Sequence, residues 1–144
     1  MAVHVLAVLA YKEGDPVTSQ FLASSVNTHP VIIRRLLLAL QQANMVETRK
    51  GAGRGSRLSR SPARISLAEV YQAVEGEESF ALPPQRPNKG CPVGQCIQQA
   101  LEKVMASAQA AMERELGTIN LADILASVKR SCAAQKTGPK KFLA

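Results

Sequence analysis

Aromatic residues are scarce in this chain of 144 residues, which has three phenylalanines, two tyrosines and no tryptophan. Modules that bind single-stranded RNA or DNA need aromatic rings on which bases stack, so this scarcity argues against that class. A double-stranded partner makes no such demand. No apolar run approaches the length of about 18 residues needed for a membrane span, and no signal peptide is apparent. We therefore expect a cytoplasmic protein with no membrane association.

Cysteine is also rare, with one residue each at Cys91, Cys96 and Cys132. An odd number does not suit a secreted disulfide framework, and the spacing is not that of a zinc finger. A turn containing proline and glycine separates Cys91 from Cys96, and it could bring the two sulfurs together as a redox switch. The alternative is that the thiols only pack as small apolar groups.

Positive charge, in contrast, is abundant and unevenly distributed. The net charge is +7 and the isoelectric point is near 9.7, which indicates an anionic partner such as nucleic acid or a membrane surface. Residues 48–68 contain no acidic side chain but hold six of the 18 basic ones, a third of the total. These six are Arg49, Lys50, Arg54, Arg57, Arg60 and Arg64.

The first half of the chain is predicted to be helical apart from one hairpin. A short helix precedes the Gly14–Pro16 breaker, and a second begins after Thr18 as its N-cap. A third helix is predicted to begin with Thr28 as its cap. Its core-facing stripe is Ile33, Leu36, Leu37 and Leu40, and Val31, Arg35, Leu38 and Gln42 face outward. Two extended stretches at 45–50 and 57–60 then surround the glycine-rich turn as a β-hairpin.

The second half is predicted to contain a linker and further helices. A helix capped by Ser66 and Glu69 stops at Gly76, which ends a first domain spanning residues 1–76. Residues 77–95 form a proline-rich linker, 96–130 a long helix and a short one at 118–128 capped by Asn120 and Asp123, and 131–144 a disordered tail. The long helix has a coiled-coil seam formed by Ile97, Leu101, Val104, Ala108 and Ala111. The fold class is thus mainly α with a small β-hairpin (α+β).

The stretch RKGAGRGSRLSR at 49–60 could cradle a nucleotide or contact a nucleic acid backbone. Neither the P-loop spacing nor the dinucleotide-binding fingerprint is met, and the strands form a hairpin rather than a βαβ unit. An isolated basic run is often only a solvated surface. Here it follows an amphipathic helix with an arginine-bearing outer face, which favours a winged helix-turn-helix on duplex DNA.

The run from TSQFLASSVNTHPVIIRRLL through GAGRGSRLSR to ISLAEVYQAVEG resembles the DNA-binding half of the Rrf2 family of bacterial winged-helix transcription regulators. CPVGQCIQQALEKVMASAQAAMERELGTINLADIL is similar to the linker and dimerisation helix of that family. The resemblance implies a homodimeric regulator, most simply a repressor, on a pseudo-palindromic operator. It also implies that the DNA-binding residues are Thr28, His29, Arg34, Arg35, Arg49, Lys50, Gly51, Gly53, Arg54, Gly55 and Arg57, and that the seam residues mediate dimerisation.

No cofactor or metal site is expected. Family members with an iron-sulfur cluster hold it with three closely spaced cysteines, whereas only Cys91 and Cys96 lie at the matching position, so a cluster is the less favoured alternative. An enzyme is not expected, because a nucleophilic Cys91 has no nearby base: His4 and His29 are in the other half. A protein-interaction module that binds nucleic acid nonspecifically through its basic wing is the rival hypothesis.

Overall fold

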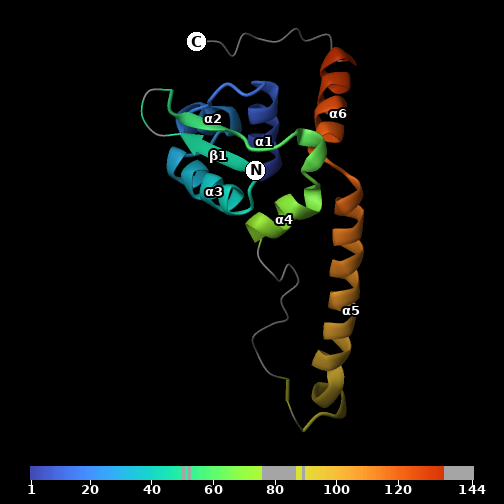
Figure 1. The fold of residues 1–144 in the computed structure, drawn as a ribbon. Helices are drawn as coiled ribbons and strands as arrows, with labels where there is room; N and C mark the ends of the chain where they lie inside the picture. Colours follow the sequence, from blue (N-terminus) through green and yellow to red (C-terminus); the bar gives the residue numbers. More distant parts are fainter. Residues whose placement is uncertain (50, 52, 76–86, 89, 135–144) are drawn as a thin grey trace.

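The computed structural model describes residues 1–49, 51, 53–75, 87–88 and 90–134. It has a small helical domain with a two-stranded hairpin, and a long helix that extends away from that domain (Figure 1). This confirms the predicted mainly helical class. The described elements, in chain order, are α1 (Ala2–Tyr11), α2 (Ser19–Val26), α3 (Pro30–Gln42), β1 (Val46–Arg49), β2 (Gly55–Leu58), η1 (Pro62–Arg64), α4 (Leu67–Glu75), α5 (Pro92–Thr118) and α6 (Leu121–Ala134).

One hydrophobic core holds the small domain together. The apolar stripes of α1, α2, α3 and α4 meet the inner face of the hairpin, and Leu6, Leu22, Ile33 and Leu40 are completely buried. Leu121 at the start of α6 is equally buried in this same core. The core therefore draws on residues from both ends of the chain.

Side-chain caps fix where several helices begin, as the sequence predicts. The Thr18 hydroxyl accepts a backbone N–H from the first turn of α2 at 3.2 Å. At α4, the Ser66 hydroxyl accepts the Glu69 N–H at 3.2 Å and the Glu69 carboxylate accepts the Ser66 N–H at 2.9 Å. Asn120 and Asp123 make the same reciprocal pair at α6, with both bonds at 3.0 Å. Each cap satisfies donors that have no partner within the helix.

The hairpin is antiparallel and is fastened to the segment before α2. Its register pairs Val46 with Leu58 and Arg49 with Gly55. Val17 forms an additional bridge with Ser56, through backbone hydrogen bonds of 2.9 and 2.8 Å. This bridge fixes the wing to the rest of the domain.

The junction between α5 and α6 is joined to the small domain by backbone hydrogen bonds. The Leu67 N–H donates to the Ile119 carbonyl and the Leu121 N–H donates to the Ile65 carbonyl, each at 2.9 Å. α4 also packs against α5, near whose C-terminal end Gly117 lies close to Ala68 (Figure 1). The orientation of α5 is consequently fixed relative to α3 and the hairpin.

Several predicted boundaries are wrong. The long helix begins at Pro92 rather than Cys96, because proline fits the first helical position, where no N–H is needed. The last helix covers Leu121–Ala134 rather than 118–128, because no glycine or proline interrupts residues 129–134, so the predicted disordered tail begins inside a helix. The second strand begins at Gly55, because that residue already pairs with β1. The remaining linker positions 77–86 and 89, the helix stop at 76 and the tail from 135 lie outside the described residues.

Candidate nucleic-acid interface

The turn before α3 sets the direction in which that helix leaves the domain. Asn27 adopts a left-handed conformation with φ of 57°, and the Thr28 N–H donates to the Ala23 carbonyl at 2.9 Å. The N-cap is His29, whose Nδ1 accepts the Val31 N–H at 3.3 Å, so the prediction of Thr28 as cap is wrong. The physical reason is that Pro30 occupies the first helical position, which makes the residue before it the cap. α2, this turn and α3 form the helix-turn-helix.

α3 presents a basic face to solvent. Its opposite face buries Ile33 and Leu40 in the core, whereas Arg34 and Arg35 are exposed. The Arg34 Nε donates to the Pro30 carbonyl at 3.3 Å, which holds this side chain near the N-terminal end of the helix. The Arg35 side chain makes no hydrogen bond or ion pair to any part of the chain that the structure describes. Its guanidinium is therefore free to bind an external acceptor.

The wing tip depends on glycine. Gly51 and Gly53 have φ values of 91° and 79°, which favour glycine, and the Arg54 N–H donates to the Gly51 carbonyl at 3.0 Å. A side chain at Gly55 would place its Cβ 2.8 Å from the backbone of Pro16, so only glycine fits beside the segment before α2. Arg49 and Arg54 are exposed on the two sides of the tip, and Lys50 lies outside the described residues.

Arg57 differs from the other predicted DNA-binding arginines. It lies directly opposite Glu47 in the hairpin register, and its Nε forms an ion pair with the Glu47 carboxylate. This pair partly neutralises the charge of Arg57. The strand register could have predicted the pair, since both residues are equally distant from the glycine turn. Beneath it, the Thr48 and Ser56 hydroxyls are 3.0 Å apart and cross-link the two strands.

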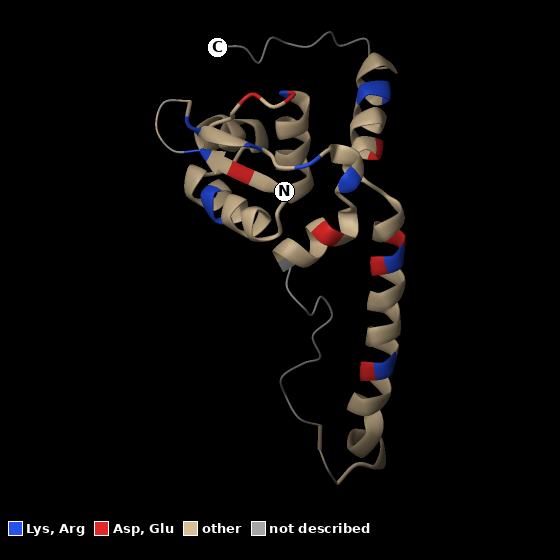
Figure 2. Ribbon diagram, in the orientation of Figure 1, with Lys and Arg blue, Asp and Glu red and all other residues tan. Residues whose placement is uncertain are grey.

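The basic residues of α3 and the hairpin lie on one side of the domain. Figure 2 shows them at the end of the molecule opposite α5 and α6. The structure thus brings together most of the residues predicted from the sequence to bind DNA. It also confirms the predicted outward position of two apolar side chains on α3, Val31 and Leu38, both of which are exposed.

The long helix α5 is 27 residues long and has no buried residue. Its predicted seam is largely uncovered: Leu101 is 36 % and Val104 62 % exposed, and Ala108 and Ala111 are exposed as well. Ile97 is half-buried. An apolar stripe of this length left in water is unusual for a stable surface helix.

The three thiols are free and exposed. Cys91 is the N-cap of α5 and Cys96 lies five residues into the helix, about 140° around its axis. The prediction of a turn between them is therefore wrong, because these residues form the start of α5. A bond between these two sulfurs would require the first turn of α5 to unwind. Cys132 lies in α6, beyond the far end of α5, which alone spans about 30 Å from Cys96.

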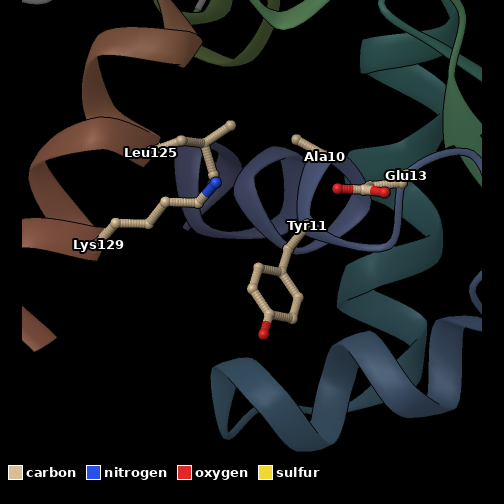
Figure 3. A pocket seen from close by; sticks show the side chains of 5 residues that line it. All are labelled: Ala10, Tyr11, Glu13, Leu125 and Lys129. Atoms are coloured by element: carbon tan, nitrogen blue, oxygen red, sulfur yellow. The ribbon is translucent and has the colours of Figure 1, made fainter. Parts of the chain in front are cut away.

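A small pocket lies between the end of α1 and α6, away from the basic face. It is lined by Ala10, Tyr11, Glu13, Leu125 and Lys129. Figure 3 shows the Tyr11 ring pointing away from the side chains of Ala10 and Leu125. None of these five residues belongs to the helix-turn-helix or the wing.

A helix that spans a membrane must be both long and apolar. Among the residues that the structure describes, no helix meets both requirements.

A helix-turn-helix with a basic outward face, followed by a basic hairpin on the same side, defines a winged helix-turn-helix DNA-binding protein of the transcription regulator class. The chain belongs to the Rrf2 family: the model of that family, described as an iron-dependent transcriptional regulator, matches residues 1–127. The chain is 40% identical over 125 residues to YwnA of Bacillus subtilis, whose name places it among HTH-type transcriptional regulators. That match covers 87% of this chain and 92% of YwnA.

Solved structures agree with this assignment. A crystal structure of a protein named as DNA-binding is 39% identical, covers 86% of this chain and 95% of its own, and superposes with a TM-score of 0.69. IscR of T. potens has a TM-score of 0.66 at 21% identity, covering 99% of this chain and 90% of its own, which shows a shared fold.

The family description implies iron, and the thiols of this chain do not fit an iron-sulfur cluster. A cluster needs several thiolates within a few ångströms of the metal, whereas Cys132 is separated from Cys91 and Cys96 by the length of α5. In the described part of the chain, no three His, Cys, Asp or Glu side chains gather as a metal site.

Proposed function

We propose that this protein is a homodimeric transcriptional repressor that binds a pseudo-palindromic operator and releases it when an oxidant or a small ligand changes the dimer geometry. Each subunit places α3 in the major groove and the wing tip in the adjacent minor groove. Arg34 and Arg35 act from α3, and Arg49, Lys50 and Arg54 act from the wing. Occupying an operator requires no further activity, which favours repression.

The observation that carries this proposal is the exposed apolar seam of α5. Backbone hydrogen bonds join α5 to the small domain that carries the basic face. Pairing two seams removes apolar surface from water without disturbing any contact within one chain. The backbone hydrogen bonds then couple the position of α5 to that of the small domain, which contains α3. They join Leu67 to Ile119 and Leu121 to Ile65. Pairing the seams about a two-fold axis places two copies of the basic face in the dimer, related by that axis. The matching DNA target is an inverted repeat, whose two half-sites are related by the same symmetry.

The wing is suited to phosphate or minor-groove contact by its charge and by its shape. Arg49 and Arg54 are exposed, and the glycines leave the tip without bulky side chains. Basic contacts of this kind supply affinity and position the protein, whereas base edges in the major groove supply sequence preference. α3 is therefore the element expected to discriminate between operators.

Selection from a pool of random duplex DNA with the full chain tests the proposal. Light scattering at the same protein concentration measures the mass of the particle and therefore its oligomeric state. We expect a dimer and an enriched inverted repeat whose half-sites are about 10 base pairs apart or a multiple of that spacing. DNA binding without enrichment would instead identify a nonspecific protein-interaction module. A monomer at all concentrations would also refute the proposal.

A further inference from the structure

The outward stripe of α3 is not purely basic. Val31 is 48 % and Leu38 61 % exposed, and Arg35 lies between them at spacings of four and three residues. These spacings place the three side chains next to one another on the helix face opposite the core. Apolar side chains at these positions gain little from their own chain and are available to an external partner.

Val31 is the apolar residue of this stripe that is closest to the start of α3. It follows His29 and Pro30, within the first turn, and its N–H is already taken up by the His29 cap. In helix-turn-helix proteins, the N-terminal residues of the recognition helix contact base edges. The seam of α5 lies at the other end of the molecule and therefore does not explain the exposure of Val31 (Figure 2).

We propose that Val31 contacts the 5-methyl group of a thymine located within about two base pairs of a guanine bound by Arg35; this inference rests on the proposed operator binding. The thymine methyl is the apolar group that the major groove offers, and arginine pairs bidentately with the O6 and N7 of guanine. Side chains four residues apart on a helix are about 6 Å apart, close to the rise of two base pairs. The stripe thus reads a thymine and a guanine that lie within about two base pairs of each other.

The test replaces thymine by deoxyuridine, which removes the methyl group and preserves base pairing. Each thymine of the selected half-site is replaced in turn. The affinity for each duplex is measured with the unmodified protein, with Val31→Ala and with Ile32→Ala. Ile32 is a matched control because it is 46 % exposed, like Val31, but lies about 100° around the helix. Circular dichroism confirms folding, which substitution of an exposed side chain should preserve.

We expect one thymine whose replacement weakens binding of the unmodified protein about fourfold in one half-site and about fifteenfold in both, as for the loss of one buried methyl group per half-site. Val31→Ala should bind the thymine and deoxyuridine duplexes equally, and Ile32→Ala should retain the full difference. The inference is wrong if no replacement weakens binding, or if Val31→Ala remains sensitive to it. Failure to recover any preferred sequence would refute the operator itself, and this inference with it.

Discussion

The substitution Val104→Glu introduces a carboxylate into the middle of the α5 seam. Full burial of a valine is worth about 1.5 to 3 kcal/mol, and Val104 exposes 62 % of its surface in the single chain. Roughly 1 to 2 kcal/mol per subunit is then available for dimerisation. Because a symmetric interface loses this contribution twice and gains two facing negative charges, the total loss is about 3 to 5 kcal/mol.

A loss of this size raises the dissociation constant of the dimer about a hundredfold to a few thousandfold. Sedimentation equilibrium over a range of protein concentrations measures this constant directly. The monomer should remain folded, because the side chain is exposed and contributes nothing to the core. Binding to a single half-site should survive, whereas the high affinity for the complete operator should be lost.

Gln99→Glu is the matched control, since it adds the same charge to an exposed position about 140° around α5 from Val104. It should leave the dissociation constant unchanged. A Val104→Glu protein that dimerises as tightly as the parent would show that the seam is not the interface.

Three further predictions concern α3, the wing and α4. Arg35→Ala should cost about 1 to 3 kcal/mol in operator affinity and relax the preference at one base pair, as measured by titration of operator variants; equal weakening on all sequences would mean that Arg35 contacts only phosphate. Gly55→Ala should lower the free energy of unfolding by about 1 to 3 kcal/mol, because its Cβ would clash with the backbone before α2, and by more than Gly53→Ala, whose Cβ would meet open space. The Ser66 N–H and the Arg60 guanidinium hold the pKa of Glu69 below its usual value. The charged carboxylate therefore stabilises the folded state at pH values above the pKa of Glu69 in the unfolded chain. This contribution is lost as the pH falls through the pKa of Glu69 in the folded state. Glu69→Gln should therefore lower stability at pH 7 by about 0.5 kcal/mol in denaturant titrations, and the difference should disappear at acidic pH; a difference that persists there would assign the effect to packing.

Local signals in the sequence were sufficient to predict much of this fold. The capping pairs Ser66 with Glu69 and Asn120 with Asp123 depend only on residues three apart, and the structure contains both. The apolar period of α3 likewise identifies its buried side without knowledge of any neighbour. Boundaries were less predictable where two local rules compete, as at His29 and at Pro92.

The amino-acid sequence by itself determined the helical periods, the caps, the glycine-rich hairpin and the basic character of one stretch, because each arises from residues a few positions apart. Only the tertiary structure decided that Arg57 is paired with Glu47, that Leu121 completes the core of the N-terminal domain, and that the seam of α5 is left uncovered. These features depend on which distant segments meet, and the free energy of burying apolar surface is shared across the whole chain rather than encoded in any short stretch of it.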